Sequence, residues 1–411
     1  MGGWETKRLA DVCEKIMDGT HFSPKSKSGS HMYLTSQNIQ NGIIELSNIS
    51  YISEEEHRQI YDKCPVKKND VLLTKDGANT GNCAINNIGY EFSLLSSVAV
   101  LRGNKLSLNH IFLYQTILTD NIQRIIRESM SGQAITRITL EKIGNFLISI
   151  TSIEEQQKIA DCLSSIDELL TLETQKLATL KSHKKGLMQQ LFPAEGETVP
   201  KLRFPEFRNA PEWEEKQLGE ISDIKTGPFG SVLHESDYVE IGTPIITVEH
   251  LGELGIIGNN APKVSYSDKI RLKAYQLKEG DIIFSRVGSV DRCAITGKTE
   301  NGWLFSGRIL RLRIINSENL SCFIKHLLKY EPSKVKIRDS AVGQTMPSLN
   351  TEILKKISLC LPLFPEQQKI ADCLSAVDEL ITAQTQKLDT LKTHKKGLMQ
   401  QLFPAADEVM G

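Results

Sequence analysis

A stretch of 40 residues occurs twice in this chain of 411 residues, first at 155–194 and again at 366–405. The two copies begin with EQQKIADCL and end with HKKGLMQQLFPA, and they agree at about 33 of their 40 positions. A repeat this long and this closely matched means that one structural element is used twice, so the fold has to provide two equivalent places for it.

Each copy has the apolar spacing of a long helix. Apolar residues recur at alternating intervals of four and three, as in the seam of a coiled coil. Ser152 with Glu155 matches an N-terminal capping box, and Pro365 suits the first turn of the second helix. Pro193 and Pro404 are expected to end the helices. Roughly 40 residues at about 1.5 Å each give a rod of roughly 60 Å. The predicted seam residues are Ile159, Leu163, Ile166, Leu170, Leu177 and Leu180, and then Ile370, Leu374, Val377, Ile381, Leu388 and Leu391.

A single helix of this kind has an apolar stripe with nothing local to cover it, so its own copy is the natural partner. Two equal elements pair best about a two-fold axis, which predicts an antiparallel pair with pseudo-two-fold symmetry. The seam holds four polar residues, Glu173, Lys184, Gln384 and Lys395. If the axis passes between them, Glu173 faces Lys395 and Lys184 faces Gln384. The equally open alternative is that these side chains lie at the edge of the seam, in water.

The remaining sequence forms two globular segments that resemble each other loosely. In the first, short β-prone runs separated by turn residues (32–36, 42–44, 70–74, 84–85 and 97–101) predict a mostly antiparallel β domain. A helix over 109–129 and a short helix and strand over 135–150 follow. In the second, DIIFSRVG at 281–288 matches DVLLTKDG at 70–77.

We therefore expect an α+β fold with two mostly β globular domains joined by two long antiparallel coiled-coil helices. The predicted segments are 1–151 for the first globule, 152–194 for the first helix, 195–362 for a connector and the second globule, and 363–411 for the second helix.

Several functional classes find no support in the sequence. The chain has a net charge of −1, which argues against coating nucleic acid through bulk charge. It has no apolar run of membrane-spanning length and no signal-peptide character, so we expect a cytoplasmic protein without a membrane partner. The eight cysteines are scattered without a C-x-x-C pair, which predicts reduced thiols and no metal site. No phosphate loop, zinc-protease, dinucleotide-binding or nucleophile-elbow motif is present, so no catalytic residue is assigned.

The globular segments do offer side chains suited to DNA. Arginine, lysine and asparagine reach base edges or phosphates, and glycine lets the backbone approach. Such residues occur in a basic loop at 19–31, in KDGANTG and RVGSVDR after predicted strands, and in an arginine-rich strand at 308–313. The alternative is a solvated loop or strand face. The candidates are Lys25, Lys27, Lys75, Asn79, Thr80, Arg286, Ser289, Arg292, Arg308, Arg311 and Arg313, the last two on one strand face.

These features together resemble the specificity subunit of type I restriction-modification systems, and the resemblance covers nearly the whole chain. It rests on the repeated EQQKIADCL…HKKGLMQQLFP helix, on VPKLRFPEF followed by WEEKQLGEI, and on GDIIFSRVGSVDRCAI at 280–295. Each motif is weak alone, but their combination is specific.

The resemblance implies that each globule is a target recognition domain reading one half of a split site in double-stranded DNA. The paired helices would space the halves and dock two methyltransferase subunits, with restriction subunits joining the complex. S-adenosylmethionine, ATP and Mg²⁺ would then bind partner subunits, and this chain would be a non-catalytic subunit without a cofactor. A non-catalytic coiled-coil adaptor for other proteins is the alternative, and it would not show salt-sensitive, sequence-selective DNA binding.

Overall fold

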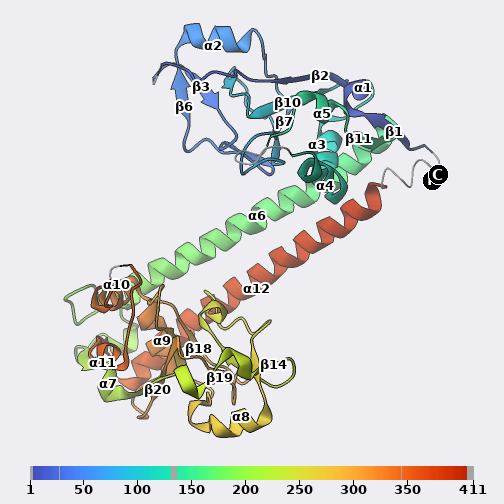
Figure 1. The fold of residues 1–411 in the computed structure, drawn as a ribbon. Coiled ribbons are helices and arrows are strands. Elements are labelled where there is room, and N and C mark those ends of the chain that lie inside the picture. The colour runs from blue at the N-terminus through green and yellow to red at the C-terminus, as the bar shows by residue number, and fades with distance from the viewer. Residues whose placement is uncertain (1–2, 27, 131–136, 344, 405–411) are drawn as a thin grey trace. The chain divides into compact units, whose positions relative to one another are not determined.

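The computed structural model describes residues 3–26, 28–130, 137–343 and 345–404. The chain divides into two compact units (Figure 1). Unit 1 comprises residues 1–173 and 387–411, and unit 2 comprises residues 174–386. Each unit therefore contains one globular segment and about half of each long helix, so the units cut across the four segments expected from the sequence.

The globular part of unit 1 is built on a four-stranded antiparallel sheet of order β2-β10-β7-β8. A three-stranded sheet, β6-β3-β9, and the pairs β1-β11 and β4-β5 accompany it. The strands are β1 (Glu5–Arg8), β2 (Cys13–Asp18), β3 (His31–Leu34), β4 (Ile39–Gln40), β5 (Ile43–Ile44), β6 (Ser50–Ile52), β7 (Val71–Thr74), β8 (Cys83–Ile85), β9 (Ser93–Leu94), β10 (Val98–Gly103) and β11 (Leu147–Ile150). The short helices are α1 (Leu9–Val12), α2 (Glu54–Tyr61), α3 (His110–Leu118), α4 (Asp120–Ser129) and α5 (Leu140–Gly144).

Both faces of this sheet are covered by a hydrophobic core. Alternate side chains of a strand point to opposite faces, so neighbouring residues of β7 join different cores. Val71 and Leu73 of β7 join a core with α3, α4 and the first turns of α6, whereas Leu72 joins a second core beneath β3. All five predicted β runs are confirmed as strands, and every pair in this unit is antiparallel except β3-β9. The single helix predicted over 109–129 is wrong, because the chain turns extended at Thr119, whose hydroxyl caps α4.

Unit 2 repeats the sheet order of unit 1 in β13-β20-β17-β18, which confirms the loose repeat. It adds the sheet β14-β16-β15-β19 and the pair β12-β21. The strands are β12 (Glu214–Gln217), β13 (Ser222–Thr226), β14 (Tyr238–Val239), β15 (Thr243–Ile246), β16 (Lys263–Val264), β17 (Ile282–Ser285), β18 (Cys293–Ile295), β19 (Leu304–Phe305), β20 (Ile309–Ile314) and β21 (Ser358–Leu361). The α-helices are α7 (Leu218–Ile221), α8 (Tyr266–Arg271), α9 (Ser321–Lys329), α10 (Glu331–Ser340) and α11 (Thr351–Lys355), and the 3₁₀ turns are η1 (Pro205–Phe207), η2 (Gly230–Val232), η3 (Glu235–Asp237), η4 (Val248–His250) and η5 (Lys273–Tyr275).

The two long helices are α6 (Ile153–Leu191) and α12 (Phe364–Leu402), each of 39 residues. The Ser152 hydroxyl accepts a hydrogen bond from the Glu155 N–H at 3.3 Å, as the capping pattern predicts. Pro365 lies in the first turn of α12, and both helices end two residues before a proline. Among the described residues, no helix has the length and apolar character needed to cross a bilayer.

Within each unit the two helix segments are held together by ion pairs. In unit 1, Asp167 meets Lys395 at 2.6 Å and Glu173 meets Lys387. The partner number falls on α12 as the number rises on α6, so the segments run antiparallel. In unit 2, Lys184 meets Asp378 at 2.5 Å, and this pair repeats Asp167–Lys395 at the equivalent positions of the 40-residue repeat.

The antiparallel arrangement was predicted correctly, but the register was not. Glu173 was expected to face Lys395 and Lys184 to face Gln384, whereas each of these charges pairs with a residue outside the apolar seam. The solvated-edge alternative is also wrong, because Glu173 is only 8% exposed and Gln384 only 5%. None of the twelve predicted seam residues is exposed; Ile159, Leu163, Ile370, Leu374, Val377, Ile381 and Leu388 are buried, and Ile166, Leu170, Leu177, Leu180 and Leu391 are partly buried.

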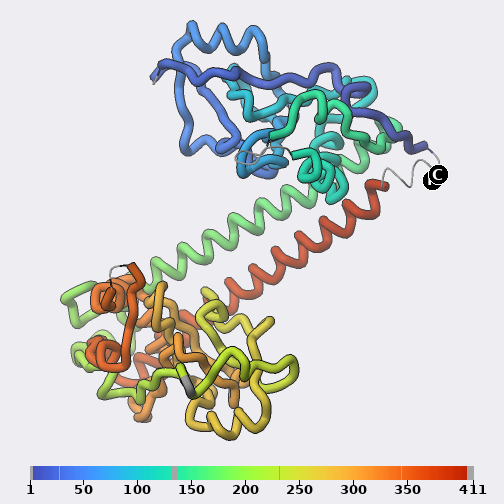
Figure 2. The backbone as a smooth tube through the Cα atoms, viewed as in Figure 1, coloured from blue at the N-terminus to red at the C-terminus, as the bar shows by residue number. Residues whose placement is uncertain are grey.

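The beginning and the end of the described chain meet in unit 1 (Figure 2). Strand β1 pairs with β11, and the Ser149 hydroxyl of β11 donates to the carbonyl oxygen of Pro404 at 3.2 Å. The first and last described segments of the chain therefore lie close together.

Candidate nucleic-acid interface

The loops that follow β7 and β17 are held in the same way in the two units. In unit 1, the Lys75 N–H donates to Ser97 O at 2.9 Å, and Lys75 O accepts from the Ile138 N–H at 2.9 Å. In unit 2, Arg286 makes the same two backbone hydrogen bonds with its equivalents, to Arg308 O at 2.9 Å and from the Leu349 N–H at 2.8 Å. Lys75 and Arg286 therefore occupy one place in the fold, at the start of the loops predicted to face DNA.

The Lys75 side chain does not lie on the surface. It is 1% exposed, and its ammonium group lies 3.2 Å from Asp18 Oδ2 and 3.5 Å from Asp76 Oδ2. A lysine buried between two carboxylates is neutralised internally and cannot extend to a phosphate without breaking those pairs. The structure thus corrects the expectation that Lys75 is an exposed DNA-contacting side chain.

The other candidates of unit 1 lie at or near its surface. Asn79 is exposed, although its amide donates to Ser36 O at 3.3 Å, and the hydroxyl of the partly buried Thr80 donates to Gly77 O at 2.6 Å. Lys25 is exposed, and Glu56 holds its backbone through a hydrogen bond of 2.7 Å from the Lys25 N–H. Lys27 lies outside the described residues.

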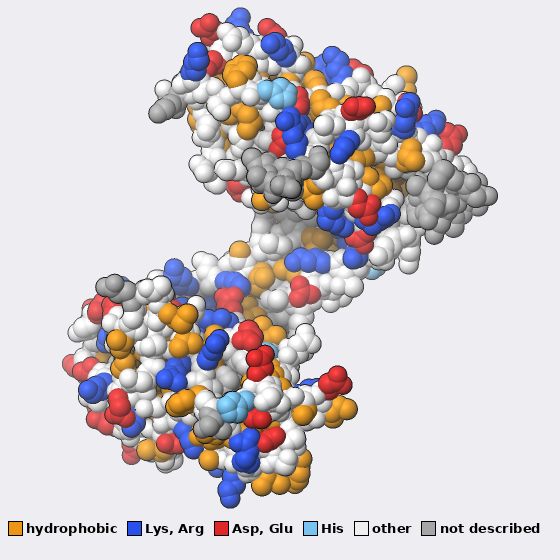
Figure 3. All heavy atoms as spheres, viewed as in Figure 1, with side chains coloured by type: hydrophobic (Ala, Val, Ile, Leu, Met, Phe, Trp, Pro, Cys, Tyr) orange, Lys and Arg blue, Asp and Glu red, His pale blue; other side chains and the backbone are white. Residues whose placement is uncertain are grey.

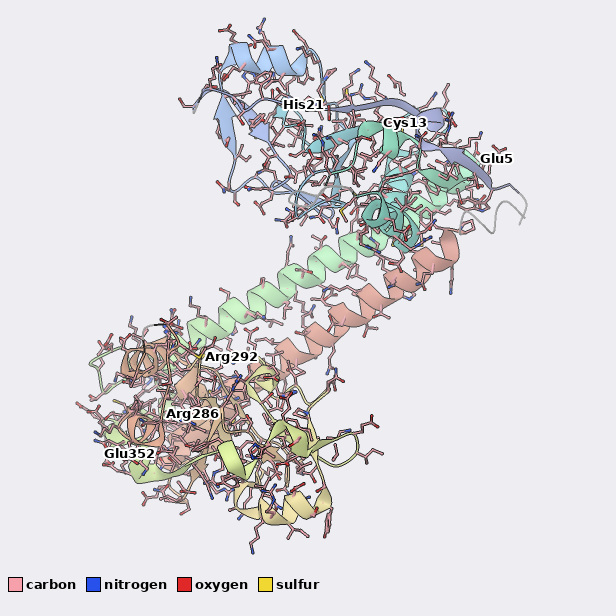
Figure 4. The ribbon with its side chains drawn as sticks, in the orientation of Figure 1. Glu5, Cys13, His21, Arg286, Arg292 and Glu352 are labelled. Atoms are coloured by element: carbon pink, nitrogen blue, oxygen red, sulfur yellow. The ribbon has the colours of Figure 1, made fainter. Side chains whose placement is uncertain are left out.

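In unit 2 the structure separates candidates that are close in sequence (Figure 4). Arg286 is half-buried, whereas Ser289 and Arg308 are exposed. Arg292 is also exposed, but its guanidinium donates to the carbonyl oxygen of Leu251 and lines a cleft beside α6. Arg286 and Arg308 thus remain together, and Arg292 belongs to a different surface.

Two arginines predicted to contact DNA form ion pairs within unit 2. Arg311 and Arg313 lie on one face of β20, as predicted, but Arg311 is 3% exposed and pairs with Asp223. Arg313 binds Asp281 through two hydrogen bonds of 2.7 Å, from Nε and Nη2, and this bonding raises the pKa of Arg313.

Arg102 and Asp70 of unit 1 are the equivalents of Arg313 and Asp281, and they form two hydrogen bonds of 2.8 and 2.7 Å. Because this Asp–Arg pair occurs at matching positions of both repeats, it serves the shared fold rather than either unit's own contacts. The matching spacing was visible in the sequence and could have identified the pair.

Each unit also has a cleft between a long helix and the junction of two short ones, which sequence reasoning missed. The cleft of unit 1 has a volume of about 500 Å³ and lies between α12 and the α3–α4 junction. The cleft of unit 2 has a volume of about 880 Å³ and lies between α6 and the α9–α10 junction. Matching positions of the repeat line both clefts: Lys392, Lys395, Lys396, Met399 and Gln400 in unit 1, and Lys181, Lys184, Lys185, Met188 and Gln189 in unit 2.

The charges around these clefts are mixed rather than uniformly basic. Lys396 pairs with Asp120 at 3.2 Å and Lys181 with Glu253 at 2.8 Å. Burial lowers the pKa of Lys329, which lines the second cleft. Basic and acidic side chains are likewise interspersed on the visible face of each unit (Figure 3). Among the described residues, no cluster of three or more side chains is suited to binding a metal ion.

Comparison with known proteins agrees with this architecture. Residues 1–182 and 211–393 each match the family model described as the type I restriction modification DNA specificity domain. The type I restriction enzyme MjaVIII specificity subunit of Methanocaldococcus jannaschii is 25% identical over 419 residues, covering 97% of this chain and 92% of that protein. A putative type I restriction enzyme MjaX specificity subunit of the same organism is 26% identical over 411 residues, with the same coverage.

A solved structure shares the fold. The crystal structure of the S subunit of a type I restriction-modification system from M. genitalium superposes with a TM-score of 0.65 at 19% identity, covering 98% of this chain and 96% of that one. The family model matches most of the chain, in two copies that each include one globular segment and much of the following long helix. The chain therefore belongs to the type I restriction-modification DNA specificity family, as a non-catalytic specificity subunit.

Proposed function

We propose that this subunit recognises a split site in double-stranded DNA, one half with each unit, and that it docks two methyltransferase subunits. The observation that carries the proposal is the contrast within the repeat. The two units share one sheet order, yet their surface loops differ, with KDGANTG after β7 and RVGSVDR after β17. Equal frameworks with unequal loops suit the reading of two different sequences by one kind of contact.

The long helices support the docking of two like partners. Their sequences are nearly identical, and each contributes the same lysine, methionine and glutamine positions to a cleft in its unit. Two equivalent surfaces on one chain are suited to two copies of one partner. The methyltransferase subunits would carry S-adenosylmethionine, and restriction subunits would bring ATP and Mg²⁺ chemistry. A target adenine stacked in the duplex would have to flip into a partner's pocket, because its reacting atom is otherwise out of reach.

The helices are also suited to fixing the gap between the half-sites. Helices α6 and α12 each pass from one unit into the other, and 39 residues at about 1.5 Å each span roughly 58 Å. Major-groove faces recur every roughly 34 Å along one side of DNA, which a rod of this length covers. The side chains proposed to contact DNA are Lys25, Asn79, Thr80, Arg286, Ser289 and Arg308. Lys27, which lies outside the described residues, stays a candidate on the basis of the sequence alone.

The deciding experiment maps adenine methylation in DNA from cells that express the chain with its methyltransferase partner, and compares it with the partner alone. Methylation at one split motif that depends on this chain is expected. No new methylation, with the partner active and bound, would favour the adaptor alternative. Exchanging residues 1–151 for another globule of the family should change one half-site only. Inserting seven residues in α6 should lengthen the gap or abolish recognition, and an unchanged gap would contradict the spacer role.

A further inference from the structure

Lys75 and Arg286 begin the loops that follow β7 and β17, and carboxylates neutralise the charge of Lys75 but not that of Arg286. In unit 1, two carboxylates surround the buried ammonium of Lys75: Asp18, at the end of β2, and Asp76, the next residue in the chain. The exposed fractions of their side chains are 13% and 19%, so solvent screens these pairs only weakly. The two carboxylates therefore balance the positive charge of Lys75 within unit 1, and Lys75 does not attract an anionic ligand.

In unit 2 both carboxylates are replaced by neutral residues. Thr226 has the register on β13 that Asp18 has on β2, since each lies opposite the equivalent residue of the neighbouring strand. Val287 makes the β-bridge that Asp76 makes in unit 1. Arg286 therefore occupies the place of Lys75 without either counter-ion.

The guanidinium of Arg286 has hydrogen-bonding capacity to spare. Its Nη1 donates to Gly307 O at 3.1 Å, whereas its Nε is buried and has no hydrogen-bond partner among the described residues. A half-buried cation without a counter-ion and with an orphan donor costs free energy in the unbound protein. Because Nε is buried, only the terminal nitrogens Nη1 and Nη2 can meet the acceptors of a ligand, and such acceptors would offset the cost of the unpaired charge.

An exposed aromatic ring lies beside this guanidinium. The Phe229 ring centre is 5.6 Å from the guanidinium carbon, and Phe229 is 64% exposed. Gly307 makes room for it, because a Cβ at that position would lie 2.6 Å from the Phe229 Cβ. The ring face limits how the planar guanidinium can turn, and its exposed remainder offers an apolar surface to a base.

We propose that Arg286, oriented by Phe229, reads a guanine in the half-site bound by unit 2, and that unit 1 has no equivalent contact because Lys75 is neutralised internally. The inference rests on the proposed function and adds a base and a residue to it. Arginine matches guanine because its two parallel N–H donors fit the O6 and N7 acceptors of that base. Arg308, whose carbonyl oxygen accepts the Arg286 N–H, is exposed and suited to a phosphate.

The test measures methylation by the complex of this chain and its methyltransferase partner on DNA libraries randomised in one half-site at a time. The wild-type complex should demand guanine at one position or more of the second half-site. Arg286→Lys keeps the charge but loses the fork, and it should reduce the preference for guanine at one position by roughly tenfold to a hundredfold. Phe229→Leu should weaken the preference at the same position by roughly twofold to fivefold. The matched control Arg308→Gln should lower methylation of all library members evenly.

The outcomes separate the inference from the proposed function. Relaxed discrimination at one guanine of the second half-site, with the first half-site unchanged, supports the role of Arg286. Wild-type preferences in both the Arg286→Lys and the Phe229→Leu complexes, or an even loss over both half-sites, would overturn it while leaving the proposed function intact. If Arg286→Lys does not assemble, Phe229→Leu decides alone. A wild-type complex without split-site methylation would overturn both.

Discussion

Replacing Asp378 with asparagine should loosen unit 2 far more than the equivalent change, Asp167→Asn, loosens unit 1. Asp378 lies among several basic groups, with Lys184 Nζ at 2.5 Å, Lys325 Nζ at 3.2 Å and His326 Nδ1 at 3.9 Å. Burial by itself would raise the pKa of Asp378, but the two lysines bring it below its ordinary value. The carboxylate thus holds α6, α9 and α12 together within unit 2.

The expected magnitudes follow from burial and from the number of cations left behind. Removing one member of a buried ion pair costs about 3–5 kcal/mol, and the side chains of Asp378 and Lys184 are 19% and 16% exposed, so we take the low end, about 3 kcal/mol. Asp167 has one lysine, Lys395, and a hydrogen bond of 2.7 Å from Gln115, and its side chain is 34% exposed. Solvent screening reduces the cost there to about 1 kcal/mol.

Hydrogen exchange read by mass spectrometry can measure both losses in the intact chain. Exchange through local opening should rise roughly 150-fold in residues 174–191 and 364–386 of Asp378→Asn, and roughly fivefold in 153–173 and 387–402 of Asp167→Asn. The exposed Asp372, also on α12, supplies a control, and Asp372→Asn should change little. Equal losses in the two units, or a larger one for Asp167→Asn, would refute the reasoning.

The same measurement should depend on pH, because the pKa of Asp378 is lowered in the folded state. A lowered carboxyl pKa stabilises the fold above the unfolded value, near 3.8, and this stabilisation is lost as the pH falls through the folded value. The difference between the wild-type chain and Asp378→Asn should therefore be full at pH 6 and shrink below about pH 4. A difference that persists undiminished below pH 3 would show that the charge is not its cause.

Three further predictions concern other ionised or titratable groups. Burial lowers the pKa of His326 to about 2, so between pH 6.5 and 4.5 the unfolded unit binds a proton that the folded unit does not. The free energy of unfolding of unit 2 should therefore fall by up to about 1.4 kcal/mol for each unit by which the pH is lowered. His326→Gln should flatten this slope in urea unfolding, and an unchanged slope would contradict the assignment. Arg203 and Glu366 form an ion pair whose side chains are 7% and 1% exposed, so Arg203→Ala should cost about 3 kcal/mol and speed proteolysis within 195–212; cleavage at the wild-type rate would count against it. Glu173→Lys and Lys387→Glu should each reduce the protection of unit 1 from exchange, and the double change should restore it; an absence of coupling would argue against the register.

The sequence predicted the long helices well because their signals are local and repeated. The apolar spacing, Ser152 and the closing prolines set their bounds to within a few residues. The register was missed because the charged seam residues pair with residues on the flanks of the helices and not with one another. These flanking residues are Asp167, Asp378 and Lys387. Each of these three residues is the immediate sequence neighbour of a seam residue, and charged residues at such positions are common on any helix, so spacing alone could not choose among them.

The candidate interface was predictable by region but not by residue. The loops after β7 and β17 were located correctly, since strand and turn residues mark them. Whether a cation there is free or neutralised depends on residues remote in sequence: Asp18 lies 57 positions before Lys75, and Asp281 lies 32 before Arg313. Only the matching Asp–Arg spacing in the two repeats could have signalled that one of these pairs is structural.

The connectivity of the two units bears on the order in which they fold during synthesis. Unit 2 is continuous, from residue 174 to residue 386, so all of its segments are present once residue 386 has left the ribosome. Unit 1 needs residues from 387 onward, and Leu398, Leu402 and Phe403 pack against a core that includes Ile159 and Leu163 of α6. The side of that core which α12 covers therefore stays exposed while more than half of the polypeptide is translated. The globule made first is the last to be completed, and a chain stopped short of its final helical turns would leave that surface open to aggregation or to a chaperone.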